Sequence, residues 1–175
     1  MKLTYERVRG ELIKVSDQMI EEGLDIGLVG HIGTGTSKIG RFFSDFFKCE
    51  CVSLPSVIRR NRNTDLAKLV NRIYPYLPES VLEVLSYRYK QLYSRDDRFL
   101  PDFNLDCLVD VKCEGMLIVD DNAFTGKTFE LWKQRLEEDA SKKIYTFAIT
   151  TTGNYRPDYS CIDGWRSFEW RPIGI

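Results

Sequence analysis

The chain has 175 residues, which is enough for one compact domain and short for two. Its 25 Lys and Arg residues nearly balance its 26 Asp and Glu residues, so the net charge of −1 predicts no partner bound through overall charge, neither nucleic acid nor membrane. No apolar run approaches the ~20 residues that cross a bilayer, and the polar first residues lack the apolar stretch of a signal peptide, so we expect a cytoplasmic protein.

The cysteines and the single histidine argue against a zinc site. None of the cysteines forms a CxxC pair, and the only histidine is His31. We therefore expect reduced thiols in the core at these five positions: Cys49, Cys51, Cys107, Cys113 and Cys161.

The first third of the chain predicts a helix followed by a strand–helix–strand unit. Apolar residues recur every three or four positions over residues 5–22 and again over 37–47, as in amphipathic helices. Residues 25–30 and 49–57 are apolar and short, which is typical of buried strands, and a Gly/Thr-rich turn covers 31–36. Such a unit is normally parallel and right-handed.

The remaining elements continue the alternation of strands and helices. Residues 59–98 are polar with helical spacing, 116–119 predict a third strand, 128–138 a helix and 144–149 a fourth strand. The tail, 153–175, is irregular and aromatic. This order predicts an α/β fold, doubly wound around a mainly parallel sheet.

We expect one domain spanning residues 1–175. Its core would cover about 25–150, interrupted by a helical insertion at about 58–104 and followed by a small C-terminal hood at about 153–175. In open α/β sheets, ligands bind at the carboxyl ends of the strands. The two most unusual turns of the chain lie at such positions.

The first of these turns follows the strand at 116–119. That strand delivers two adjacent carboxylates, Asp120 and Asp121, which suit the vicinal hydroxyls of a sugar because each hydroxyl donates to an ionised acceptor. Gly126 then lets the backbone approach a ligand, and a helix begins near Thr128. Helix N-termini and their N–H groups suit a phosphate. The segment therefore combines a diol-binding acid pair with a phosphate-binding turn.

Residues 117–121 followed by 125–128 resemble the phosphoribosyl-diphosphate (PRPP) binding motif of type I phosphoribosyltransferases. The resemblance implies that Asp120 and Asp121 are catalytic residues that bind the ribose 2′- and 3′-hydroxyls. It also implies that Mg²⁺ binds the diphosphate and ribose oxygens, with Asp120 and Asp121 contacting it only through water. The implied ribose and 5′-phosphate site comprises Asp120, Asp121, Asn122, Ala123, Phe124, Thr125, Gly126, Lys127 and Thr128. Asn122 departs from the motif, which usually has an apolar residue there.

The second turn, residues 30–37, follows the first core strand and contains three glycines, Gly30, Gly33 and Gly35. Glycine-rich turns between a strand and a helix are common in α/β proteins, so the pattern alone is weak. In the resembled family the corresponding loop binds the diphosphate through backbone amides. The implied loop comprises His31, Ile32, Gly33, Thr34 and Gly35.

Two further groups have a functional and a structural interpretation. Arg59 and Arg60 would reach the diphosphate, but a solvated charge cluster is the commoner explanation of such a run. Trp165 or Trp170 in the tail would stack on a nucleobase, as in the hood of the resembled family, or would form a small hydrophobic cluster.

The expected function is PRPP-dependent phosphoribosyl transfer to a nitrogen acceptor, a nucleobase, with release of diphosphate and, by analogy, in a homodimer. A non-catalytic protein of the same fold that binds PRPP or a nucleotide as an effector is the main alternative. A degenerate P-loop NTPase is a distant one, because Gly30 to Ser37 lacks the lysine of GxxxxGK[ST]. An acid pair that merely ends a strand is the structural alternative.

Overall fold

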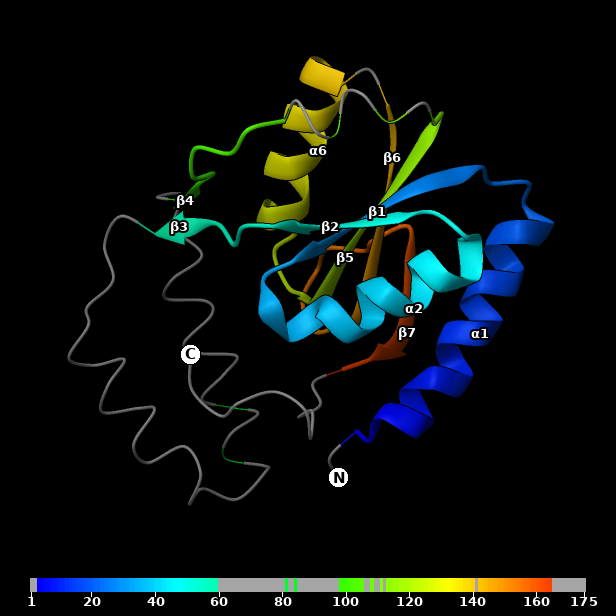
Figure 1. The fold of residues 1–175 in the computed structure, drawn as a ribbon. Coiled ribbons are helices and arrows are strands. Elements are labelled where there is room, and N and C mark those ends of the chain that lie inside the picture. Colours follow the sequence, from blue (N-terminus) through cyan, green and yellow to red (C-terminus); the bar gives the residue numbers. More distant parts are fainter. Residues whose placement is uncertain are drawn as a thin grey trace.

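The computed structural model describes residues 3–59, 81, 84, 98–105, 108, 111, 113–140 and 142–164. Helices and strands alternate along most of this chain (Figure 1). Their bounds are α1 Tyr5–Glu21, β1 Ile26–Ile32, the 3₁₀ helix η1 Thr34–Thr36, α2 Ser37–Phe47, β2 Glu50–Leu54, β3 Ile58–Arg59, β4 Arg98–Phe99, β5 Gly115–Ala123, α6 Lys127–Ala140, β6 Lys143–Thr151 and β7 Tyr159–Asp163.

The main sheet has five strands in the order β2-β1-β5-β6-β7, and every pair of neighbours is parallel. Because all the strands point the same way, their carboxyl ends share one edge of the sheet. The observed order confirms the doubly wound α/β fold predicted from the sequence.

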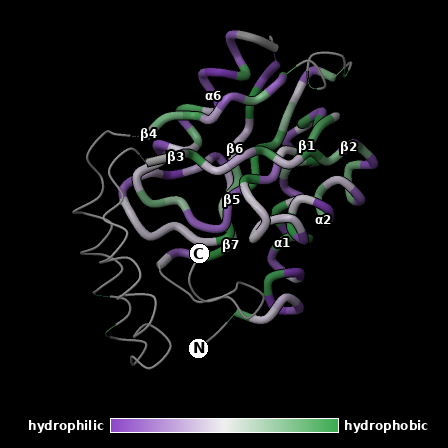
Figure 2. The backbone as a smooth tube through the Cα atoms, turned by 60° about the vertical axis from the view of Figure 1, so that its left-hand side comes forward, coloured by the Kyte–Doolittle hydropathy of each residue, from purple (hydrophilic) through white to green (hydrophobic). Residues whose placement is uncertain are grey.

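Helices cover both faces of this sheet, with α1 and α2 on one side and α6 on the other (Figure 1). On the α1/α2 side, Leu117 and Val119 of β5 pack with Val8 and Phe43 in one buried cluster. On the α6 side, Met116 and Ile118 pack in a second cluster that includes Phe129, Trp132 and Leu136. Figure 2 shows the matching alternation of hydrophilic and hydrophobic residues along α6. Both faces of β5 are therefore buried, as its continuous apolar run predicts.

The periodic segments form the elements predicted for them, with small shifts of their ends. The helix over 37–47 has the predicted bounds, and the predicted helix over 5–22 ends at Glu21. Thr4 caps α1, because its side-chain oxygen accepts the Arg7 N–H at 3.3 Å. The strand predicted for 25–30 continues to Ile32. The predicted turn at 31–36 is thus shorter, since His31 and Ile32 belong to β1.

The strand predicted for 49–57 is also shorter, because β2 ends at Leu54. Pro55 follows, and proline has no N–H to donate to a sheet. The Pro55 carbonyl instead accepts the Trp132 indole N–H at 3.2 Å, which ties this connection to α6. Next, Ile58 and Arg59 pair antiparallel with Phe99 and Arg98, a two-stranded sheet that the sequence did not predict.

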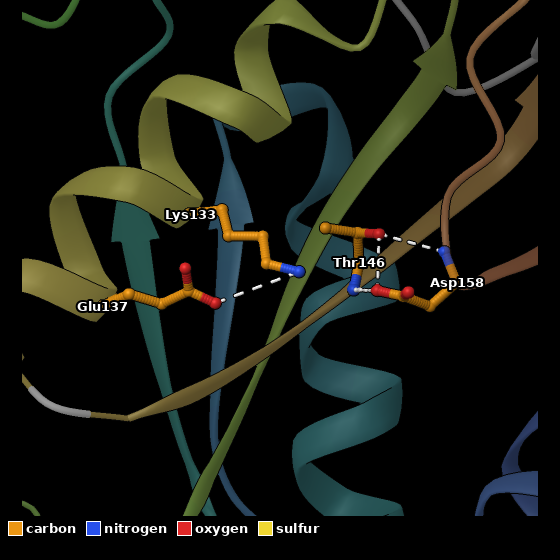
Figure 3. Close-up of polar contacts among 4 residues, drawn as sticks. All are labelled: Lys133, Glu137, Thr146 and Asp158. Carbon is orange, nitrogen blue, oxygen red and sulfur yellow. Dashed lines mark hydrogen bonds and ion pairs between the residues drawn. The ribbon is translucent and has the colours of Figure 1, made fainter.

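The tail predicted to be irregular contains a fifth strand of the main sheet, β7. Asp158 precedes it and faces Thr146 of β6 (Figure 3): its carboxylate accepts the Thr146 N–H and hydroxyl, each at 2.8 Å. Tyr159, the first residue of β7, donates its hydroxyl to the carboxylate of Glu22, the residue that follows α1. These contacts fix an edge strand whose own sequence has no apolar alternation.

Several sequence predictions fall outside the described residues. These are most of the predicted helical insertion, Arg60, and the tail tryptophans Trp165 and Trp170. Arg59 lies in β3, where the structure describes its backbone and not its side chain. Among the residues that are described, no helix is long and apolar enough to cross a membrane.

The four cysteines within the described ranges, Cys49, Cys51, Cys113 and Cys161, are free thiols and partly buried. Burial raises the pKa of Cys49 to about 11 and that of Cys161 to about 12. These two thiols therefore stay protonated at neutral pH and pack as small apolar side chains.

Candidate active site

The acid pair lies inside β5 rather than after it. The strand was predicted to end at Val119, but it continues through both acids to Ala123. Since side chains alternate along a strand, Asp120 and Asp121 leave opposite faces of the sheet. Asp120 is half-buried, whereas Asp121 is buried at 7% exposure. Asp120 is therefore the more accessible of the two acids.

Asp120 also shapes its own backbone. One carboxylate oxygen of Asp120 accepts the Asp121 N–H at 2.8 Å. This local hydrogen bond fixes the orientation of the Asp120 side chain in the carboxyl-terminal half of β5.

A three-residue turn, Phe124 to Gly126, connects β5 to α6. The helix begins at Lys127, one residue before the predicted start, and the Lys127 N–H lies 3.4 Å from Thr125 Oγ1. The first N–H groups of a helix have no acceptor within the helix, so this end of α6 presents donors and the positive end of its dipole. Lys127 adds an ammonium group, 3.7 Å from the Glu130 carboxylate.

The fold itself requires a glycine at position 126, for its backbone conformation and for the space that a side chain would fill. The φ of Gly126, +74°, lies in the left-handed region, which favours glycine. A Cβ at this position would lie 2.0 Å from Cδ2 of the Tyr155 ring. Tyr155 stacks in turn on Phe129 of α6, with 5.7 Å between ring centroids. The sequence suggested that this glycine allows close approach of a phosphate; the structure adds that it allows close approach of Tyr155.

The turn after β1 is formed by η1, Thr34–Thr36, which continues directly into α2. Gly33 precedes it with a φ of +66°, and its N–H donates to the Leu54 carbonyl at 2.9 Å. The Thr36 hydroxyl donates to the Ile32 carbonyl at 2.7 Å, and His31 Nδ1 donates to the Gly33 carbonyl at 2.8 Å. His31 and Thr36 therefore stabilise this turn through hydrogen bonds to nearby carbonyl groups.

Gly30 has a packing role. It lies within β1, in register with Val52 of β2 and Ile118 of β5, and a Cβ there would lie 2.5 Å from the Met116 side chain. In a P-loop, by contrast, the glycine-rich segment between strand and helix wraps the phosphates. Because Gly30 and His31 are paired within the sheet, the segment from Gly30 to Ser37 does not have that form.

The fold brings the two predicted turns together. β1 and β5 are neighbours, with His31 in register with Val119, one residue before the acid pair. The 3₁₀ helix η1 also contacts β5. The acid pair, the turn before α6 and the turn before α2 thus share one edge of the sheet, as parallel topology requires.

The ends of β6 and β7 bring further polar residues to the same edge, which were not predicted from the sequence. Thr150 and Thr152 donate to Asn122 Oδ1 at 3.1 Å and 2.9 Å. The Thr151 hydroxyl donates to the carboxylate of Asp163 at the end of β7. A signal was present: three successive threonines follow the apolar strand at 144–149, just as the acid pair follows its own strand.

The donors at this edge fit a magnesium ion held partly by a ligand. Mg²⁺ prefers hard oxygen ligands and is commonly bound through one or two carboxylates together with phosphate oxygens and water. The half-buried carboxylate of Asp120 is of that kind. Within the described part of the chain, no group of three or more His, Cys, Asp or Glu residues forms a metal site from protein atoms alone.

Comparison with known proteins identifies the fold. No protein-family model matches the sequence, and no curated protein sequence matches it. Among solved structures, the chain is similar to a Helicobacter pylori xanthine-guanine-hypoxanthine phosphoribosyltransferase, with 13% identity, a TM-score of 0.65, and coverage of 97% of this chain and 94% of the other. It is also similar to a purine phosphoribosyltransferase from Pyrococcus horikoshii Ot3, with 16% identity, a TM-score of 0.63, and coverage of 100% and 96%.

A third similar structure is a hypothetical protein from Neisseria gonorrhoeae with bound ppGpp, at 12% identity, a TM-score of 0.61, and coverage of 99% and 92%. At these identities the likeness concerns the fold and not the activity. The chain has the fold of the type I phosphoribosyltransferases, as its acid-pair motif predicted.

Proposed function

We propose that the protein is a PRPP-dependent phosphoribosyltransferase that transfers the phosphoribosyl group to a ring nitrogen of a nucleobase. One observation carries this proposal: the acid pair on β5 and the two glycine-containing turns meet at one edge of a sheet that has the phosphoribosyltransferase fold. Each of these parts suits a different portion of PRPP.

The ribose and the 5′-phosphate would bind along β5 and the start of α6. We expect Asp120, the more accessible acid, to accept hydrogen bonds from the ribose hydroxyls, whereas Asp121, buried on the opposite face of β5, would act through its negative charge. Residues 123–128 hold the 5′-phosphate through the Thr125 and Thr128 hydroxyls and the first N–H groups of α6. The exposed ammonium of Lys127 adds charge compensation.

The diphosphate would bind at the turn between β1 and α2. The Gly33 N–H is already used by the Leu54 carbonyl, so Thr34 and Gly35, at the start of η1, are the better amide donors. His31 and Ile32, which the motif also suggested, support the turn from within β1. The predictions for Arg59 and Arg60 at the diphosphate stay predictions.

In this reaction the protein mainly positions the reacting groups and stabilises the charge that develops on them. The C1′–oxygen bond to diphosphate breaks, a C1′–nitrogen bond forms, and the acceptor nitrogen loses its proton. Positive charge develops on the ribose, where the carboxylates of Asp120 and Asp121 oppose it. Bound Mg²⁺ supplies neutralisation of the leaving diphosphate, and Asp120 is the residue placed to hold it through water.

A purine is the first acceptor to test, because two of the similar structures are enzymes described as acting on purines. Trp170 as a stacking residue stays a prediction. A binding protein without turnover is the second candidate, since the similar Neisseria protein was solved with a bound nucleotide, ppGpp.

Diphosphate release tests the proposal. The full chain is incubated with PRPP, Mg²⁺ and a panel of purine and pyrimidine bases, and diphosphate and the nucleotide product are quantified. We expect release that depends on one class of base and is lost in the Asp120→Asn, Asp121→Asn double variant. The matched control is Asp17→Asn, Asp25→Asn, which removes the same charge at exposed positions on α1 and before β1.

The two candidates separate in this experiment. Binding of PRPP or ppGpp without diphosphate release for any base would favour the binding protein. Absence of both binding and release would overturn the proposal.

A further inference from the structure

Asn122 lies between the acid pair and the phosphate turn, where the resembled motif usually has an apolar residue. It is half-buried in β5, directly opposite Thr150 of β6. Its side-chain oxygen accepts hydrogen bonds from the hydroxyls of both Thr150 and Thr152. One amide thus ties the end of β5 to the end of β6.

The same stretch of β5 is bound to the β6 side at four consecutive residues. Thr150 Oγ1 also lies 3.1 Å from the Asp121 carbonyl. The Thr152 N–H donates to the Ala123 carbonyl at 2.9 Å, and the Tyr155 N–H to the Phe124 carbonyl at 3.4 Å. Residues from Asp121 to Phe124 therefore each have an oxygen held by residues 150–155, and Asn122 is the one that uses its side chain.

Burial makes these bonds costly to lose. Thr150 is 1% exposed, so its hydroxyl needs a partner within the protein. Asn122 Oδ1 lies within hydrogen-bond distance of the hydroxyls of Thr150 in β6 and of Thr152 just after it, so it holds the end of β6 in a fixed relation to β5.

On the basis of the function proposed above, we infer that Asn122 is a positioning residue that fixes the separation between the diol-binding acids and the phosphate-binding turn. The acids precede Asn122 directly, and the turn begins two residues after it. A ligand that contacts both places at once needs that separation held constant. A ligand that contacts only the turn does not.

The test compares a ligand with two contact points and a ligand with one. Ribose 5-phosphate carries both the diol and the phosphate, whereas inorganic phosphate carries only the latter. In Asn122→Leu, which keeps the side-chain size and removes the acceptor, we expect affinity for ribose 5-phosphate to fall about tenfold, with affinity for inorganic phosphate nearly unchanged. Thr152→Val should lower affinity for ribose 5-phosphate in the same way. Thr152→Ser keeps the hydroxyl, so it should bind ribose 5-phosphate as the unaltered protein does.

Thr146→Val is the matched control. Thr146 lies on β6, is as buried as Thr150 at 1% exposure, and uses its hydroxyl for Asp158 rather than for β5 (Figure 3). Thr146→Val should lower the stability of the protein without changing the ratio of its affinities for ribose 5-phosphate and inorganic phosphate. Combining Thr152→Val with Asn122→Leu should add little to the effect of Asn122→Leu, because that change already removes the contact with Thr152.

The outcomes separate this inference from the proposed function. Equal losses for both ligands, or no loss for either, would overturn the positioning role while leaving phosphoribosyl binding intact. If the unaltered protein binds neither ribose 5-phosphate nor PRPP, the proposed function fails and the inference fails with it.

Discussion

The two turns at the active edge are stabilised in different ways. The turn between β1 and α2 has two short-range side-chain bonds, from the Thr36 hydroxyl and the His31 ring to carbonyls at most four residues away, and one longer-range bond from the Gly33 N–H to the Leu54 carbonyl. The turn between β5 and α6 is held by a distant part of the chain. There, Thr152 and Tyr155 donate backbone hydrogen bonds to Ala123 and Phe124.

This difference shows which part of the site depends on long-range packing. A turn held by local bonds tolerates changes elsewhere in the protein, whereas the β5 turn needs the segment after β6 to be in place. If the proposed function is right, the 5′-phosphate end of PRPP is the end that is sensitive to residues far away in sequence.

The largest expected effect is at Gly126. Gly126→Ala combines a left-handed backbone with a collision against Tyr155 and should cost roughly 2–5 kcal/mol in the free energy of unfolding. Gly23→Ala is the control: its φ is +73°, with no atom within 4 Å of the added Cβ, so it should cost only about 1–2 kcal/mol. Urea unfolding measures both. Equal losses would show that Tyr155 does not constrain the turn.

The next expected effect is a coupling between Tyr155 and Gly126. Tyr155→Ala removes the ring that the added methyl group meets, so the cost of Gly126→Ala should fall by ~1–3 kcal/mol in that background. A double-mutant cycle by urea unfolding gives this coupling energy. Strict additivity would contradict the packing described here.

Thr36→Val should have a smaller and local effect. It removes the buried hydroxyl that donates to the Ile32 carbonyl, at an expected cost of about 1–2 kcal/mol. Since the Thr36 bond and the Gly126–Tyr155 contact share no residue, the coupling of this change with Gly126→Ala should be near zero in the same unfolding cycle. A large coupling would show that the two turns are not separately held.

The smallest expected effect is on the outer surface of α6. Lys133 and Glu137 lie 3.9 Å apart, and both side chains are more than a third exposed (Figure 3). Lys133→Ala should change the free energy of unfolding by less than about 0.5 kcal/mol, because water and salt screen such a pair. A loss as large as that of Thr36→Val would contradict the screening of this ion pair by water and salt.

The order of the central elements could be predicted because each has a local signal. The helix over 37–47 is marked by its apolar spacing, and β5 by an apolar run bounded by glycine and acids. The helix start near Thr128 was also predicted within one residue. Short-range patterns of this kind are read directly from neighbouring residues.

Other features depend on contacts between distant residues. β7 was missed because Asp158 and Tyr159 fix it through Thr146 and Glu22, far away in sequence. The burial of Asp121 was missed because β5 extends past the acids only where β6 pairs with it, as at Asn122. No local pattern predicts such pairings.

A calorimetric titration of PRPP with Mg²⁺ into the full chain is the sharpest test of PRPP binding at the acid pair. We expect the unaltered protein and Asp17→Asn, Asp25→Asn to bind alike, and Asp120→Asn, Asp121→Asn to lose at least about 30-fold in affinity, since two charged acceptors are replaced. Thermal unfolding of each variant confirms that it is folded. Unchanged affinity in a folded Asp120→Asn, Asp121→Asn variant would contradict the account.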